Sequence, residues 1–155
     1  MRTTLIALCA AACAAIPTQA AAIGFTSLTT IYVGAGVQDT TGAGANTATV
    51  IACANVSGVA TTVRILLLDT TGAVADSLVE GLAHGAHLTA ATRGVATIAG
   101  ELVLDSGAIT GGVVNIEATQ SGVFCTAALM DAVSAVATGV ALHLVRVNAH
   151  PGTVE

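Results

Sequence analysis

The segment Val113–Thr119, with the sequence VVNIEAT, has the cleanest alternation of apolar and polar residues in the chain. Every second residue from Val114 to Ala118 is apolar, whereas Asn115 and Glu117 occupy the positions between them. Successive side chains of a β-strand point to opposite faces of the sheet, so this spacing is typical of a half-buried strand. The segment therefore predicts a sheet that covers a hydrophobic core with one face and meets solvent with the other.

Other segments of the same kind lie on both sides of this one. They are short, rich in Val, Ile and Thr, and separated by turn residues, which is typical of strands. These segments are Leu28–Val33, Thr47–Asn55, Thr61–Leu68, Val123–Met130 and Val140–Asn148. Three further segments are ambiguous: Ala73–Leu82 fits a strand or, from Ala75, a helix, Ala86–Thr92 fits a strand, and Ala132–Thr138 fits a loop or a helical turn.

Short strands at regular intervals with turns between them predict an all-β fold. We expect an antiparallel β-sandwich of at least about seven strands, with an Ig-like or fimbrial-like Greek key. No part of this pattern requires a helix in the main domain.

The first 20 residues have the organisation of a cleavable signal peptide. Arg2 supplies a positive charge, Leu5–Ile16 is an uninterrupted apolar run, and Pro17 follows with several small residues. This order predicts a signal helix that is removed during export, with cleavage after Ala20 or Ala22.

Two other fates of this leader are alternatives. The apolar run is shorter than the roughly 20 residues of a membrane-spanning helix, but an uncleaved anchor is one possibility. Lipid attachment at Cys13 is the other, because small residues precede it. With residues 1–20 removed, we expect residues 21–155 to form a single domain that is secreted or periplasmic, with association with the cell surface as an alternative.

Charge excludes several classes of partner. The chain contains no lysine, and after cleavage three arginines face nine acidic residues, a formal net charge of −6. Nucleic acids and anionic membranes are bound mainly through Lys and Arg. We therefore expect a protein partner or self-association, no nucleic acid, and no membrane span in the mature chain.

Two cysteines, Cys53 and Cys125, lie beyond the leader. Disulfides persist in exported proteins, so this pair predicts one bridge that joins two strands. Two buried free thiols are the alternative.

Three short motifs combine an acid, a hydroxyl residue and glycine. DTTGA occurs at Asp39–Ala43 and Asp69–Ala73, and LDSGA occurs at Leu104–Ala108. Aspartate at the start of a turn accepts backbone N–H bonds, and glycine takes positive φ. We therefore interpret all three motifs as corners between strands, with the second closing a hairpin.

The third motif, extended to LVLDSGA at Leu102–Ala108, also resembles the active-site strand and turn of aspartic proteases. The resemblance implies a retropepsin-like site that uses Asp105, with the second carboxylate supplied by another motif or by a homodimer. We expect the turn interpretation to hold and the protein not to be an enzyme.

His84 and His87 form an H-x-x-H pair, which is a weak candidate for a metal site because metals require three or four converging ligands. We expect both histidines to face solvent, and we expect no cofactor. Asn55-Val56-Ser57 matches a glycosylation sequon, a match that arises often by chance.

The composition of the mature chain resembles that of bacterial fimbrial subunits: Ala, Gly, Thr and Val dominate, and two cysteines remain. The resemblance implies a polymerising subunit that exchanges strands with its neighbours. The C-terminal residues His150–Glu155 depart from it, because they lack the alternating strand with an aromatic end that such subunits present to a chaperone. We predict a secreted non-catalytic structural or interaction protein, with a pilus-type subunit as the alternative.

Overall fold

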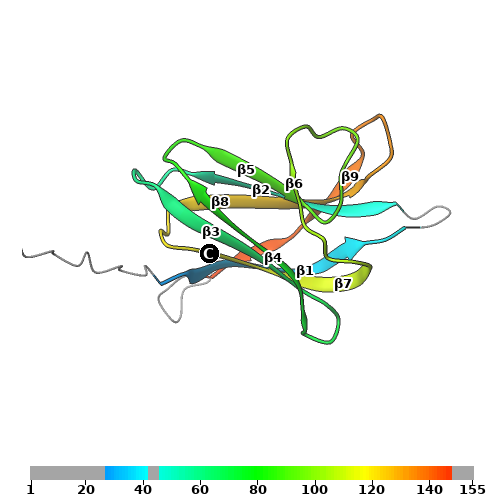
Figure 1. Ribbon diagram of the computed structural model, residues 1–155, viewed down its shortest axis with the longest axis horizontal. Coiled ribbons are helices and arrows are strands. Elements are labelled where there is room, and N and C mark those ends of the chain that lie inside the picture. Colours follow the sequence, from blue (N-terminus) through cyan, green and yellow to red (C-terminus); the bar gives the residue numbers. More distant parts are fainter. Residues whose placement is uncertain (1–26, 42–45, 148–155) are drawn as a thin grey trace, which may run out of the picture.

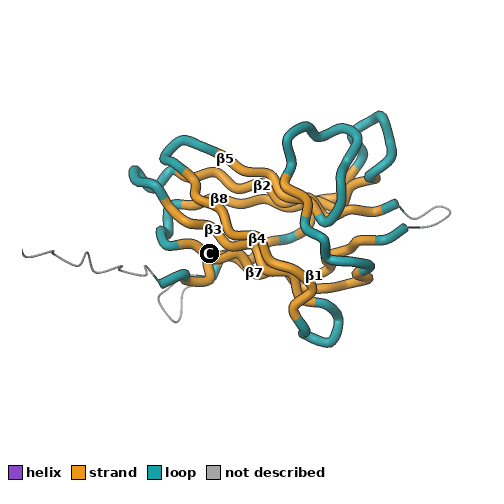
Figure 2. The backbone as a smooth tube through the Cα atoms, viewed as in Figure 1, coloured by secondary structure: helices purple, strands orange, loops and turns teal. Residues whose placement is uncertain are grey.

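The computed structural model describes residues 27–41 and 46–147, and all the regular structure in these residues is β-strand (Figure 2). The prediction of an all-β fold is confirmed. The predicted signal peptide, its cleavage sites and Cys13 lie outside the described residues. The strands are β1 Thr29–Asp39, β2 Thr47–Asn55, β3 Thr61–Leu68, β4 Val74–Leu82, β5 His87–Ala91, β6 Leu102–Val103, β7 Ile109–Ala118, β8 Val123–Asp131, β9 Gly139–Leu142 and β10 Leu144–Arg146.

The ten strands form one mixed sheet that curls back on itself (Figure 1). Hydrogen-bonded neighbours follow the order β4-β3-β7-β1-β2-β5-β6, with β8 between β2 and β9, and β10 beside β1. The sequence predicted two antiparallel sheets. The structure has one sheet because β1 pairs with β7 along most of its length and with β2 at its end. The sheet is mixed because β5 and β6 run parallel.

Strand β7 carries the alternating segment and lies between β1 and β3. Its alternate apolar residues from Val114 to Ala118 are at most 1% exposed. Glu117, which the alternation assigned to solvent, is only 8% exposed. Arg64 lies directly opposite it on β3 and forms an ion pair with it, and the Asn115 amide donates to it at 3.1 Å. The Glu117 carboxylate is therefore buried on the outer face of the sheet, where its ion pair with Arg64 of the neighbouring strand compensates its charge.

One hydrophobic core fills the inside of the curl. Strands β1, β3 and β7 cover it on one side, and β2, β5 and β8 cover it on the other (Figure 1). Each fully buried Val, Leu or Ile stabilises the fold by about 1.5–3 kcal/mol. The larger core residues include Ile31, Val37, Ile51, Val63, Ile65, Leu67, Leu88, Leu104, Ile109 and Ile116.

A second, smaller cluster lies on the outer face of β2 and β5. Val95 and Ile98, from the loop that follows β5, pack there against Ala48, Val50 and Ala91. The Thr92 hydroxyl fixes this loop, since it donates to the Gln38 carbonyl at 3.1 Å and accepts the Thr49 N–H at 3.0 Å. The outer face of this half of the sheet is therefore covered by the chain itself.

The C-terminal segment connects the two halves of the curl. The sequence predicted one strand over Val140–Asn148, but the segment divides at His143, and β9 pairs with β8 while β10 pairs with β1. Strand β1 also continues well beyond its predicted end at Val33. A Cβ atom at Gly34 would lie 2.6 Å from the Leu144 side chain, so glycine is what allows β10 to approach β1 this closely.

Candidate functional site

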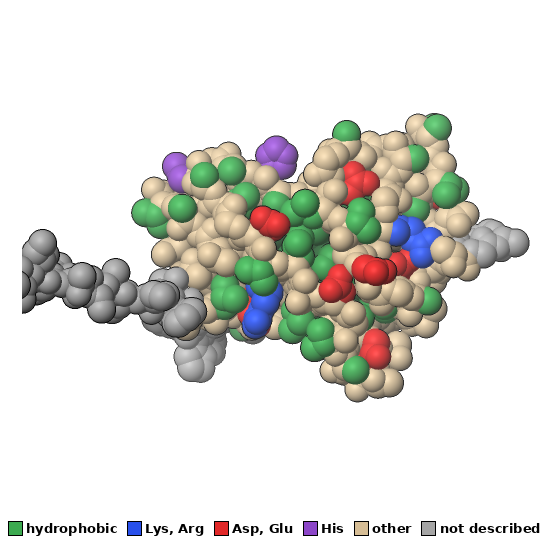
Figure 3. All heavy atoms as spheres, in the orientation of Figure 1, with side chains coloured by type: hydrophobic (Ala, Val, Ile, Leu, Met, Phe, Trp, Pro, Cys, Tyr) green, Lys and Arg blue, Asp and Glu red, His purple; other side chains and the backbone are tan. Residues whose placement is uncertain are grey.

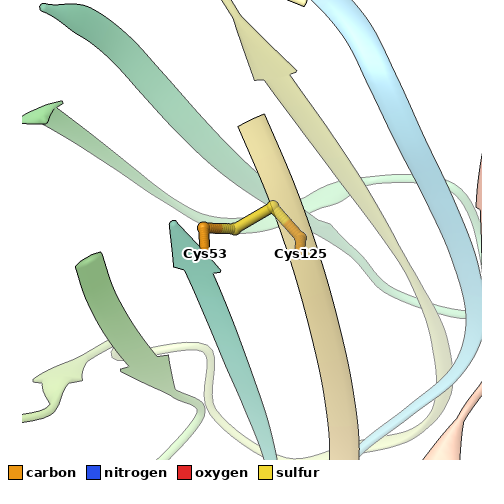
Figure 4. The surroundings of a disulfide bond; sticks show 2 residues. All are labelled: Cys53 and Cys125. Atoms are coloured by element: carbon orange, nitrogen blue, oxygen red, sulfur yellow. A yellow bond between two sulfur atoms is a disulfide. The ribbon is translucent and has the colours of Figure 1, made fainter. Parts of the chain in front are cut away.

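Cys53 of β2 and Cys125 of β8 form a disulfide between neighbouring strands (Figure 4). The two residues lie directly opposite each other, with their Cα atoms 4.1 Å apart. Three residues beyond each cysteine toward the same end of the ladder, the Val56 N–H donates to the Gly122 carbonyl. Hydrogen-bonded and non-hydrogen-bonded pairs alternate along an antiparallel ladder, so the cysteines form a non-hydrogen-bonded pair, in which Cα atoms lie about 4.5 Å apart. Both cysteines are buried in the main core. The predicted bridge is present and ties two strands together side by side.

The first acidic motif lies between β1 and β2, as the corner interpretation predicted, and its residues 42 and 43 lie outside the described part of the chain. Asp39 is the last residue of β1 and is 4% exposed. Its carboxylate forms an ion pair with Arg93 and accepts a hydrogen bond from the Ser106 hydroxyl at 3.3 Å. Within the described residues, no backbone N–H donates to the Asp39 carboxylate, and Arg93, a cation from the loop after β5, pairs with it instead. Asp39 therefore anchors two loops to the end of β1.

The second motif is the predicted turn between β3 and β4. The Asp69 carboxylate accepts the backbone N–H of Thr71 at 2.8 Å, the Thr71 hydroxyl at 2.7 Å and the Ala73 N–H at 3.0 Å. Gly72 has a φ of 84°. These hydrogen bonds, led by the one from the Thr71 hydroxyl, hold the pKa of Asp69 below its ordinary value. Asp69 therefore stabilises a hairpin turn.

The third motif lies in the loop between β6 and β7. Leu104 is buried, whereas Asp105 is exposed and its backbone N–H donates to the Asp76 carboxylate at 2.7 Å. Within the described residues, no second carboxylate forms a hydrogen bond with the Asp105 side chain. The fold joins the first and third motifs through Ser106 and Asp39. This arrangement anchors the loop, and the Asp105 side chain itself is exposed to solvent.

The two candidate histidines are exposed, and Figure 3 shows two histidine side chains at the margin of the face in view. The His84 Nδ1 accepts the Gly58 N–H at 3.1 Å, so this ring ties the loop after β2 to the loop after β4. His87 begins β5. Across residues 27–41 and 46–147, no three His, Cys, Asp or Glu side chains are grouped to hold a metal ion.

The sequon asparagine is a buried structural residue. Asn55 is fully buried, and its amide donates to the carbonyls of Val59 at 2.7 Å and Leu82 at 2.8 Å. Its side-chain oxygen accepts the Ser57 N–H and hydroxyl. Both amide protons are therefore engaged in the folded chain, and the nitrogen is not available to a glycan.

The structure brings together a cluster centred on Arg146 that no local sequence pattern indicates. The guanidinium carbon lies 5.7 Å from the centre of the Tyr32 ring and 5.1 Å from that of the Phe124 ring. Its Nη2 donates to the Ser121 carbonyl at 2.7 Å. Tyr32 is 7% exposed and Phe124 is 53% exposed, so the cluster reaches from the core to the surface. Its members come from β1, β8 and β10, and only the pairing of those strands brings them together.

Arg146 also differs from the other described arginines in its electrostatics. Arg64 pairs with Glu117 and Arg93 pairs with Asp39, whereas within the described residues Arg146 lies within salt-bridge distance of no carboxylate. In the face drawn in Figure 3, most of the acidic side chains lie in its right half, beside a basic side chain. The Arg146 cluster, defined as Tyr32, Phe124 and Arg146, is therefore the candidate binding site that the structure adds.

The outer edge of β4 provides a further surface. Strand β4 pairs with β3, and along its other edge no described residue pairs with it. A groove of about 280 Å³ separates this edge from β5, and Glu80, Leu82, His87 and Thr89 are among its lining residues. Free strand edges are places where another strand can add to a sheet.

No protein-family model, curated protein or solved structure matches this chain. None of the described residues belongs to a helix that is long and apolar enough to cross a membrane.

Proposed function

We propose that the protein is an exported, non-catalytic structural or interaction protein of the cell envelope or extracellular space. The observation that carries the proposal is the Cys53–Cys125 bridge inside the core, since disulfides of this kind persist in oxidising compartments. The leader-like organisation of residues 1–20 agrees with export.

The contacts of the chemically versatile side chains support a non-catalytic role. Asp39 neutralises Arg93, Asp69 closes a hairpin turn, and His84 accepts a backbone N–H. Each of these contacts stabilises a loop or a turn of the fold. The Arg146 cluster has the residue types that dominate binding interfaces, Arg and Tyr with a partly exposed Phe, and it supports a role in recognition.

Export is tested by expressing the full chain in a bacterial host and separating periplasm, medium and cytosol. The wild type should be found outside the cytosol. Leu8→Arg, which places a charge in the apolar run, should keep the chain in the cytosol, and the matched change Leu8→Ile should not. A wild-type chain that stays in the cytosol with reduced thiols would contradict the proposal.

The alternative is a polymerising pilus-type subunit, with the curled sheet classed as an Ig-like or fimbrial-like Greek-key sandwich. The free edge of β4 and the groove beside it favour this alternative. Electron microscopy and size exclusion of the purified protein distinguish the two functions, because filaments indicate the subunit and a compact monomer indicates the stand-alone binder. Val79→Lys, at an exposed position on β4, should reduce any polymerisation, since lysine protects strand edges.

A further inference from the structure

A cavity of about 120 Å³ lies beside Arg146, where β1, β7 and β10 come together. Hydroxyl and amide side chains form part of its lining, from Thr29, Thr30, Gln120 and Ser121. Ile31 and Val147 add aliphatic surface. The lining therefore combines one cation, neutral polar groups and an apolar wall.

The guanidinium of Arg146 is held in place with most of its donors unused. Arginine carries five N–H donors in one plane, and the only hydrogen bond that this side chain makes with described residues is the one from Nη2 to Ser121. The rings of Tyr32 and Phe124 occupy positions over the guanidinium. The remaining donors lie at the edge of the guanidinium plane, where a planar acceptor with two oxygens can receive parallel hydrogen bonds.

The charge of the surroundings limits the ligand to a single negative charge. The full chain has a formal net charge of −5 and no lysine, and the other two arginines of the described residues are already paired with carboxylates. A phosphate dianion would meet only one cation in an acidic protein. A carboxylate matches both the charge and the planar geometry of one guanidinium.

We propose that Arg146 and this cavity bind a carboxylate carried on a small aliphatic group. The volume has room for about four water-sized units, taking about 30 Å³ for each, which suits a carboxylate on a short aliphatic group. A short-chain carboxylic acid and the carboxyl terminus of a polypeptide share this chemistry. The inference goes beyond export and does not depend on it.

The test is an NMR titration of the ¹⁵N-labelled exported protein, or of the full chain if export fails. The probes are propionate, N-acetyl-Ala-Ala with a free carboxyl terminus, the same peptide as its amide, and sodium chloride at matched ionic strength. The two carboxylates should give saturable shifts confined to the backbone amides around Thr30 and Ser121. The amide and chloride should not give these shifts.

Two variants assign the binding to Arg146. Arg146→Lys keeps the charge but loses the planar fork, and it should weaken carboxylate binding by about tenfold or more. Val145→Thr, the exposed neighbour on the same strand, should leave binding unchanged. The ¹⁵N spectrum of each variant reports whether it has folded.

Each outcome of the titration decides a point. Binding of propionate alone identifies a free small acid as the source of the carboxylate, and tighter binding of the peptide acid identifies a polypeptide terminus. Several results would each overturn the proposal. In the titration these are equal binding of the acid and amide peptides, equal shifts with chloride, or no saturable shift with either carboxylate. With the variant, it is a folded Arg146→Lys protein whose affinity for carboxylate is unchanged.

Discussion

Replacing Asn55 by alanine tests how the end of β2 holds the loops around it. The side chain is fully buried and makes four hydrogen bonds of 2.7–2.9 Å. Two of them reach the carbonyls of Val59 and Leu82, and two come from Ser57. Alanine removes all four hydrogen bonds and leaves the groups that bonded to Asn55 without this partner.

The expected loss follows from where those partners lie. The bond to the Leu82 carbonyl connects buried groups, and an unpaired buried acceptor costs about 1–3 kcal/mol. The other three bonds are only partly buried, so water can replace their partners at a smaller cost. We expect Asn55→Ala to lower the free energy of unfolding by about 3 kcal/mol.

Urea unfolding of the oxidised protein, followed by far-ultraviolet circular dichroism, measures this loss. The m-value should stay unchanged if the variant retains the same fold. Ser57→Ala is the control: it removes only the hydroxyl bonds of that residue and should cost less than about 1 kcal/mol. A loss for Asn55→Ala no larger than that of the control would refute the reasoning.

Three further changes test other parts of the fold. Replacing both Cys53 and Cys125 by alanine should lower the free energy of unfolding by about 4 kcal/mol, because the bridge closes a loop between residues 72 apart and so restricts the unfolded chain. A loss below about 1 kcal/mol would contradict this expectation. Thr71→Val should raise the pKa of Asp69 toward its ordinary value of 3.8, as measured by carbon NMR of the carboxyl group. Because the pKa of Asp69 is lowered in the folded state, its carboxylate stabilises the fold above the unfolded-state pKa, and this stabilisation is lost as the pH falls through the folded-state pKa. The variant should therefore be less stable at neutral pH, and its stability should fall less on acidification. An unchanged pKa of Asp69 would count against this assignment. Gly112→Ala would press a Cβ against the Leu68 backbone oxygen of β3, and it should cost roughly 1–3 kcal/mol. An unchanged melting temperature would argue against this close approach.

Local pattern was sufficient to predict most strands. The structure gives β2 and β3 the same bounds as the sequence did, Thr47–Asn55 and Thr61–Leu68. Both segments alternate and are rich in Val, Ile, Leu and Thr, so local preference agrees with the fold. The helical spacing in Ala75–Leu82 was overruled because β4 pairs with β3 along its whole length.

Features that depend on distant partners were not predictable. Asp39 and Asp69 begin identical five-residue motifs, yet one is buried in an ion pair and the other closes a turn. The difference lies in Arg93, which a local pattern cannot place near Asp39. The parallel pairing of β6 with β5 and the ring positions around Arg146 are likewise set by strand pairing and curl.

The intact mass of the exported protein, measured with and without reductant, tests the central claim most directly. Export with an internal bridge predicts a chain that has lost Met1–Ala20 or Met1–Ala22. Its mass should rise by two hydrogens on reduction, as Cys53 and Cys125 become thiols, and no lipid should be attached. A full-length chain whose mass is unchanged by reductant, with both cysteines open to alkylation, would contradict the account.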